Sequence, residues 1–234
     1  MRQKQSLAFK KAPSSFPPIE LGDVHVWYTR LDPDNLIVQE LRSLLSKDEL
    51  ERASTFHFDL DRDRFIVAHG RLRMMLGHYL DHDPSNIKFH YSSIGKPGLH
   101  PALLEFNIAH AGNIALYVFS PGRKVGVDVE RIHPVPEAKL IISRYFSVRE
   151  RILFYFTSHV NRDLVFLEWW TRGEAFIKAI GRKFGDHFGA MSKPRIKLDD
   201  QYWEIRSLFP HPDYVGAIAM DESPRKIFCW YWPE

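Results

Sequence analysis

The spacing of apolar side chains along the chain predicts strands that alternate with amphipathic helices. Runs rich in β-branched and aromatic residues predict strands at residues 24–29, 87–91, 114–119, 125–132, 196–205, 214–220 and 227–232. Apolar residues at helical spacing predict two long helices, over residues 64–80 and 164–180. This mixture of helices and strands favours an α+β fold.

Two shorter helices are predicted from capping boxes, in which a Ser hydroxyl and a Glu carboxylate each bond a free backbone N–H group. Ser46 and Glu49 have this spacing, and Ser147 and Glu150 repeat it 101 residues later. The same shift places the first predicted long helix on the second, although few residues are identical. The matched order of caps, helices and strands predicts an internal duplication.

The duplication predicts three parts of the chain. We expect an extended arm over residues 1–20, an N-terminal half over residues 21–121 and a C-terminal half over residues 122–234. The arm contains a Ser-Ser-Phe-Pro-Pro run, which favours an extended segment over a signal peptide. Since a cleft between two halves is a usual place for a ligand, we expect the functional site there.

Composition excludes several classes of protein. Hydrophobic residues make up 44% of the chain and charged residues 26%, which argues against disordered and fibrous proteins. The single cysteine, Cys229, cannot form an intramolecular disulfide, and no apolar run is long enough for a membrane span. We therefore expect a cytoplasmic protein with no membrane partner. The net charge of +3 is too small to indicate a nucleic-acid binder, but it is compatible with acidic partners.

Two acidic residues are expected on one face of a strand. In the alternating segment 126–130, Asp128 and Glu130 lie on the face opposite to Val127 and Val129. Adjacent carboxylates raise each other's pKa unless a cation neutralises them, and Mg²⁺ prefers such oxygen ligands. A metal site is one interpretation, and two exposed acids on an amphipathic strand are the other.

A third acid lies on the second long helix. Trp170, Glu174 and Lys178 follow one another at four-residue spacing and therefore share a face of this helix. Glu174 could complete a metal site of three carboxylates, and Lys178 could reach a phosphate beside the metal. The alternative is an ordinary surface ion pair within one helix.

Basic side chains upstream supply candidate phosphate ligands. His110 is expected in a loop of small residues, where a ligand could approach its imidazole, and Lys96 lies on a turn stiffened by Gly and Pro. Arg52 and Arg71, on the predicted helices of the first half, are further candidates. Each of these residues could instead have a purely structural or solvent-exposed role.

Four segments in order resemble the 4′-phosphopantetheinyl transferases. They are Gly95-Lys96-Pro97, Phe106-Asn107-Ile108-Ala109-His110, the strand at residues 125–130, and the helical segment from Trp170 to Gly181. The chain is most similar to the surfactin-synthetase-activating type, in which one polypeptide contains two similar halves. The resemblance implies a pseudo-dimeric α+β fold of two similar halves with a cleft between them, in agreement with the duplication.

The resemblance also implies an enzyme and its chemistry. Such enzymes transfer the phosphopantetheine arm of coenzyme A to a serine of an apo acyl or peptidyl carrier protein and release adenosine 3′,5′-bisphosphate. By the family pattern, Asp128, Glu130 and Glu174 would hold Mg²⁺, or Mn²⁺ in its place. Arg52, Arg71, Lys96, His110 and Lys178 would bind coenzyme A. Glu130, Lys178 and His110 would be the catalytic residues, with Glu130 accepting the serine proton.

Two departures from the family pattern leave a second hypothesis open. Ala109 stands where the family usually has Ser, and Gly173 stands where it usually has Lys. These changes favour a weakened relative that binds coenzyme A or a carrier protein without efficient transfer. A nucleic-acid-binding module is a third hypothesis, which the small net charge disfavours. We expect a monomer, because two fused halves reduce the need for a partner subunit.

Overall fold

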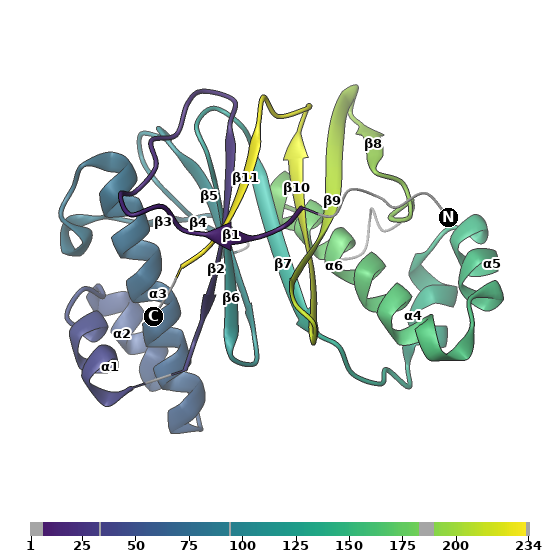
Figure 1. Cartoon of the computed structure of the whole chain (residues 1–234), viewed down its shortest axis with the longest axis horizontal. Helices are drawn as coiled ribbons and strands as arrows, with labels where there is room; N and C mark the ends of the chain where they lie inside the picture. Colours follow the sequence, from purple (N-terminus) through teal and green to yellow (C-terminus); the bar gives the residue numbers. More distant parts are fainter. Residues whose placement is uncertain (1–6, 33, 94, 183–189, 233–234) are drawn as a thin grey trace.

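Two helical layers enclose two β-sheets in the computed structural model (Figure 1). The structure describes residues 7–32, 34–93, 95–182 and 190–232. The elements before Gly122 are β1 (Lys10–Lys11), β2 (Val24–Arg30), α1 (Asn35–Arg42), α2 (Lys47–Ser54), α3 (Asp59–Leu80), η1 (Pro84–Asn86), β3 (His90–Tyr91), β4 (Pro97–Gly98), β5 (Glu105–Ala111) and β6 (Ile114–Ser120). Those after it are β7 (Val125–Arg131), α4 (Ala138–Tyr145), α5 (Val148–Phe156), η2 (His159–Asn161), α6 (Arg162–Ile180), β8 (Arg195–Leu198), β9 (Gln201–His211), β10 (Tyr214–Asp221) and β11 (Ile227–Tyr231).

One strand of the C-terminal half belongs to the sheet of the N-terminal half. The first sheet has the strand order β1-β11-β2-β6-β5, and the second has the order β7-β10-β9-β8. Although β11 comes from the end of the chain, it pairs in parallel with β2 in the first sheet. The described part of the N-terminal arm, which starts at Leu7, contacts both halves in Figure 1: Leu7 bridges to Leu208 of β9, and β1 pairs with β11. These contacts tie the two halves together.

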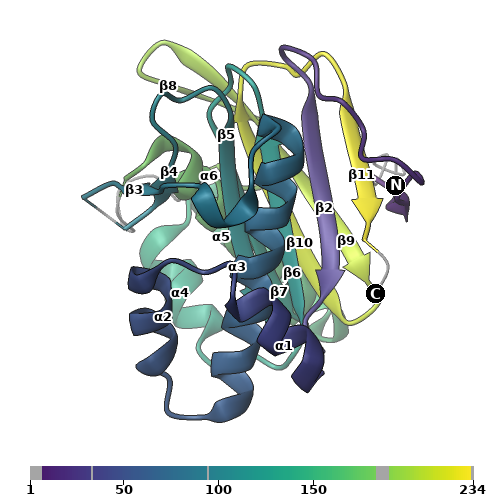
Figure 2. The same cartoon turned by 90° about the vertical axis from the view of Figure 1, so that its left-hand side faces the viewer.

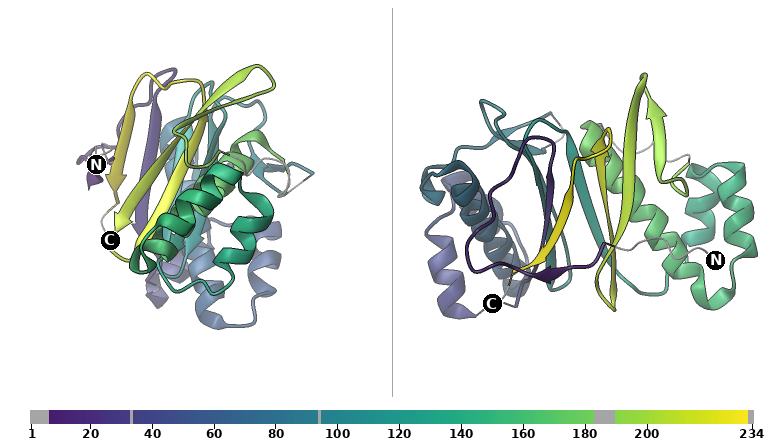
Figure 3. Two further views of the ribbon diagram at one scale, coloured as in Figure 1. Left: turned by 90° about the vertical axis from the view of Figure 1, so that its right-hand side faces the viewer. Right: turned by 45° about the horizontal axis from the view of Figure 1, so that its top comes forward.

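Each sheet has one outer face covered by helices. Figure 2 shows α3 lying along the first sheet with α1 and α2 outside it, and Figure 3 shows α6 running obliquely across the second sheet. Apolar side chains fill three layers, one under each helical layer and one between the sheets. In β7, Val125, Val127 and Val129 enter the layer between the sheets. The alternation of the strand therefore turns its acidic residues toward α6.

The duplicated features have the same structural roles in both halves. Both capping boxes are present, at the start of α2 and of α5. The strand β2 pairs antiparallel with β6, and β7 pairs in the same way with β10. Arg71 in α3 and Arg172 in α6 are both buried, and each donates to backbone carbonyl groups. The α+β fold class predicted from the sequence is thus confirmed.

Two strand predictions and one loop prediction need correction. Residues 196–205 form a hairpin, because Asp199 and Asp200 adopt positive φ angles of 48° and 61° and turn the chain between β8 and β9. His110 lies in strand β5, which sequence reasoning treated as a loop, and the turn falls at Gly112 and Asn113. Within residues 87–91, only His90 and Tyr91, which form β3, pair with another strand. Short polar strands of this kind lack the continuous apolar pattern that identifies a buried strand.

No helix in the described ranges has both the length and the apolar character that a membrane span requires.

Candidate functional site

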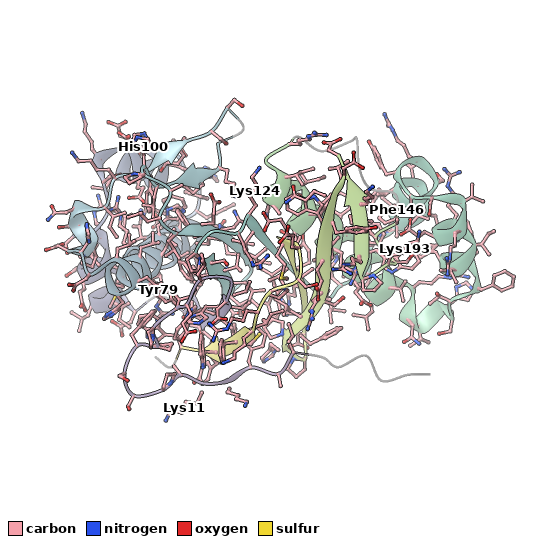
Figure 4. The ribbon with its side chains drawn as sticks, turned by 90° about the horizontal axis from the view of Figure 1, so that it is seen from above. Lys11, Tyr79, His100, Lys124, Phe146 and Lys193 are labelled. Atoms are coloured by element: carbon pink, nitrogen blue, oxygen red, sulfur yellow. The ribbon has the colours of Figure 1, made fainter. Side chains whose placement is uncertain are left out.

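A cavity of about 290 Å³ lies where the two halves meet. The first half contributes Arg52, Phe56, Phe65, His69, Gly95, Lys96, Pro97, Asn107, Ile108 and His110 to its wall, and the second half contributes Ile177, Lys178 and Arg182. In the view from above, Lys124, immediately before β7, lies at this junction, and His100 lies farther out on the first half (Figure 4). A larger cavity of about 390 Å³ contains none of the predicted site residues. The smaller cavity is therefore the candidate site.

Basic side chains approach this cavity from both halves. Lys96 reaches from the β3–β4 turn and donates from Nζ to the Val125 carbonyl at 3.0 Å. Burial lowers the pKa of Lys96, and the charge of Lys124 lowers it further, against the opposing charge of Glu105. Arg52 of α2 lies over the Phe65 ring, 5.4 Å from its centroid. Such a set of cations is suited to a phosphorylated ligand.

The His110 imidazole completes the group of nitrogen donors from the first half. It lines the cavity near the end of β5, and the residue is exposed. Desolvation lowers the pKa of His110, His69 lowers it further when protonated, and so do the positive charges of Lys178 and Arg52. An anion bound among these groups would favour the protonated imidazole and reverse this shift.

Close packing of β7 on α6 positions the acidic residues. A Cβ atom on Gly126 would lie 2.1 Å from the Ala175 carbonyl oxygen and 2.5 Å from the Ala179 nitrogen, so only glycine permits this approach. The approach places Asp128 against Lys178, with Nζ 2.7 Å from Oδ1. The carboxylate face predicted for this strand therefore lies against the helix that carries the third acid.

The three acidic residues act on one another electrostatically. Burial raises the pKa of Asp128, and the Lys178 charge opposes this. Burial also raises the pKa of Glu130, and the neighbouring Asp128 charge raises it further. The pKa of Glu174 is raised by burial, then by Asp128 and Glu130, with Lys178 in opposition. Mutual repulsion of this kind is relieved by a bound cation.

The donor chemistry of these residues fits a divalent metal. They supply only carboxylate oxygens, and Oδ2 of Asp128 is buried with no hydrogen-bond partner among the described residues. Within the described ranges, however, no three acidic, His or Cys side chains converge as a ligand set. The Lys178 ammonium group instead accompanies Asp128. The metal-ligand roles of Asp128, Glu130 and Glu174 stay a prediction.

His69 is among the cavity residues that the sequence did not indicate as part of a site. His69 is 7% exposed and lies in α3, with its Nδ1 atom 3.0 Å from Oε1 of Glu49. Its ring stacks on Phe65, with the centroids 4.0 Å apart. The four-residue spacing from Phe65 to His69 and on to Arg73 was visible in the sequence as one helix face. Nothing in the sequence linked this face to Glu49.

Other residues singled out from the sequence lie away from the cavity. Arg71 is buried against β2, where its guanidinium donates to the Thr29 hydroxyl and the Arg30 carbonyl. Ala109 packs in the apolar layer between the sheets, so the hydroxyl that it lacks would not face the cavity. Gly173 is buried in α6. Residues 183–189, which follow the family-like segment that ends at Gly181, lie outside the described residues.

Comparison with known proteins gives a consistent result. A sequence profile of the 4′-phosphopantetheinyl transferase superfamily matches residues 124–219. 4′-Phosphopantetheinyl transferase HetI of Nostoc sp. is 33% identical over 211 residues, which cover 85% of this chain and 87% of HetI. 4′-Phosphopantetheinyl transferase Sfp of Bacillus subtilis is 26% identical over 199 residues, covering 84% of this chain and 86% of Sfp. Both alignments include the acidic strand and the helix that packs on it.

Proposed function

Because this chain belongs to the 4′-phosphopantetheinyl transferase superfamily, we propose that it moves the 4′-phosphopantetheine arm of coenzyme A onto a serine of an acyl or peptidyl carrier protein. We further propose that the reaction depends on Mg²⁺ and releases adenosine 3′,5′-bisphosphate. The observation that carries this proposal is the position of Asp128 and Lys178. They lie 2.7 Å apart where the halves meet, beside a cavity lined with basic residues.

Binding of coenzyme A is assigned to the cavity. Arg52, Lys96 and His110 come from three separate elements of the first half and all line it. Three fixed cations or proton donors favour a nucleotide with several phosphate groups, which offers oxygen atoms in more than one direction. Arg71 is left out of this binding set, because its guanidinium is used by the backbone at the end of β2.

Mg²⁺ is assigned to Asp128, Glu130 and Glu174. When bound, the ion would supply positive charge that neutralises the diphosphate and its leaving oxygen. The support is the donor set itself: three carboxylates whose pKa values burial raises, with the Asp128 charge raising those of Glu130 and Glu174 further. Oδ2 of Asp128 has no hydrogen-bond partner among the described residues. Lys178 would add a second positive charge for the same diphosphate once it is drawn from Asp128.

The reaction is a substitution at phosphorus. The serine Oγ atom attacks the phosphorus that carries the pantetheine arm, and the bond from this phosphorus to the bridging oxygen breaks. The electron pair of that bond leaves with adenosine 3′,5′-bisphosphate, and Glu130 accepts the serine proton. The raised pKa of Glu130 makes its carboxylate a better base than an exposed glutamate. Positioning and electrostatic stabilisation supply most of the catalysis in such transfers.

Mass spectrometry of an apo carrier protein tests the proposal. The carrier is incubated with the enzyme, coenzyme A and Mg²⁺, and the expected product is heavier by one phosphopantetheine group. Asp128→Ala is expected to abolish this product. Glu137→Gln serves as the matched control, because Glu137 is an exposed acid at the start of α4 with no capping bond. Binding of coenzyme A without transfer to any of several carriers would favour the weakened relative instead.

A further inference from the structure

We propose that His69 is a phosphate-binding residue of the cavity, and that Glu49 holds its ring so that protonation of His69 accompanies binding of the nucleotide. This inference rests on the proposed function, because it takes coenzyme A as the ligand of the cavity. It adds a binding residue that the family resemblance did not supply. It also predicts a proton taken up from solution when the nucleotide binds.

Glu49 is a permanently charged anchor for the imidazole. Its side chain is 1% exposed, and Oε2 accepts hydrogen bonds from the Ser46 amide at 2.9 Å and from Arg73 Nε at 2.7 Å. Burial acts to raise the pKa of Glu49, but the hydrogen bonds from His69 and Ser46 and the charge of Arg73 outweigh it and lower the pKa to about 2. Glu49 is therefore a carboxylate at any physiological pH.

The tautomer of His69 follows from this anchor. A carboxylate can only accept hydrogen bonds, so Nδ1 of His69 carries the proton that faces Oε1 of Glu49. The stack on Phe65 fixes the plane of the ring, which leaves Nε2 as the remaining polar atom of this cavity-lining side chain. In neutral His69, Nε2 has a lone pair that repels a phosphate oxygen. In protonated His69, the same atom donates a charge-assisted hydrogen bond.

The second half shows that the fold does not require this arrangement. Glu150, which corresponds to Glu49 in the duplication, is equally buried, but it accepts hydrogen bonds from the backbone amides of Ala190 and Ser192. The residue that corresponds to His69 there is Trp170. One capping carboxylate thus serves a loop in the second half and a cavity histidine in the first.

The surrounding charges set the direction of the pH dependence. Glu49 of α2 contacts His69, and Arg52 (α2), His110 (β5) and Lys178 (α6) line the same cavity. Arg73 (α3) and Tyr91 (β3) interact with Glu49, and Asp61 (α3) interacts with His110. The Glu49 carboxylate favours a positive charge on His69, the cavity cations oppose it, and a bound anion adds to the favourable side. Since a bound phosphate dianion favours protonated His69, affinity is expected to rise as pH falls through the range in which histidine titrates, by up to about tenfold per pH unit.

Titration calorimetry in buffers of different ionisation enthalpy counts the protons taken up when coenzyme A binds. For the unaltered protein, above the pH range in which histidine ordinarily titrates, we expect net proton uptake. His69→Gln should abolish it and weaken binding about tenfold, as expected for loss of one charge-assisted hydrogen bond. His69→Arg should keep the affinity and remove the uptake, because its charge is permanent. Both variants keep a partner for Glu49, and thermal melting checks that they fold.

His110→Gln separates the two cavity histidines. If proton uptake persists in His69→Gln and disappears in His110→Gln, the proton enters His110 and the proposal is wrong. Dephospho-coenzyme A, which lacks the 3′-phosphate, then shows which phosphate contacts His69. Loss of proton uptake with this ligand identifies the 3′-phosphate, and retained proton uptake identifies the diphosphate. Either result supports the proposal. Absence of coenzyme A binding by the unaltered protein would instead overturn the proposed function, so the two failures are distinguishable.

Discussion

The contact between β7 and α6 predicts a strong effect for Gly126→Ala. The added Cβ atom would lie 2.1 Å from the Ala175 carbonyl oxygen and 2.5 Å from the Ala179 nitrogen. Both neighbours are backbone atoms of α6, so neither can rotate away, and the strand or the helix must shift. Overpacking of a core typically costs about 1 to 3 kcal/mol, and a clash with backbone belongs at the upper end. We therefore expect a loss of about 3 kcal/mol in the free energy of unfolding.

This loss corresponds to a fall in Tm of about 6 to 12 °C for a domain of this size, measurable by calorimetry or circular dichroism. The shift would also separate Asp128 on β7 from Lys178 and Glu174 on α6, and a displacement of about 1 Å can lower the transfer rate about 100-fold. Gly98→Ala is the matched control, because its new Cβ atom would meet only the His90 carbonyl oxygen, at 3.8 Å. A Gly126→Ala variant as stable and as active as the control would refute this reasoning.

Three further predictions concern the cations and the buried acid. Arg52→Ala is expected to raise KM for coenzyme A with little change in Tm, whereas Arg71→Ala should lower Tm and leave KM unchanged. Steady-state kinetics and thermal melting measure the two effects. The opposite pattern would make Arg71 the ligand-binding residue and Arg52 the structural one. Lys178→Met leaves Asp128 without its cation, so the pKa of Asp128 should rise further. Carbon-detected NMR titration of the Asp128 carboxyl group measures this pKa. An unchanged pKa would show that the Lys178 charge does not stabilise the Asp128 carboxylate. Glu49→Gln should cost about 3 kcal/mol near neutral pH, because Arg73 loses its charged partner. The folded-state pKa of Glu49 is depressed to about 2, so the stability that its carboxylate contributes is present above the ordinary glutamate pKa and is lost as pH falls toward 2. Urea unfolding at several pH values measures the stability lost in Glu49→Gln. A loss that stays the same at every pH would contradict this prediction.

The main features of the fold could be predicted from the sequence because they depend on local patterns. The capping boxes at Ser46 and Ser147, the two long helices and most of the strands follow from residue types at fixed spacing. The crossing of β11 into the first sheet could not be predicted in this way, because nothing local to residues 227–231 specifies a partner 200 residues earlier. The pairing of strands that are distant in the sequence depends on the tertiary packing of the whole molecule.

The candidate site could likewise be predicted only where it depends on local patterns. Alternation in β7 correctly placed Asp128 on the face away from Val127, and helix periodicity placed Glu174 and Lys178 together. The different roles of Arg71 and His69 could not be predicted from local patterns. These side chains are two residues apart on one helix, and only packing against β2 and α2 decides that Arg71 serves the backbone while His69 faces the cavity.

The most direct test of the account is a crystal structure of the protein with coenzyme A and Mn²⁺, in which anomalous scattering locates the metal. We predict one ion bound by oxygens of Asp128, Glu130 and Glu174 and by the diphosphate, with the Lys178 ammonium group moved from Asp128 onto the phosphate. An ion bound elsewhere, or a nucleotide seated outside the cavity beside Arg52 and Lys96, would contradict the account.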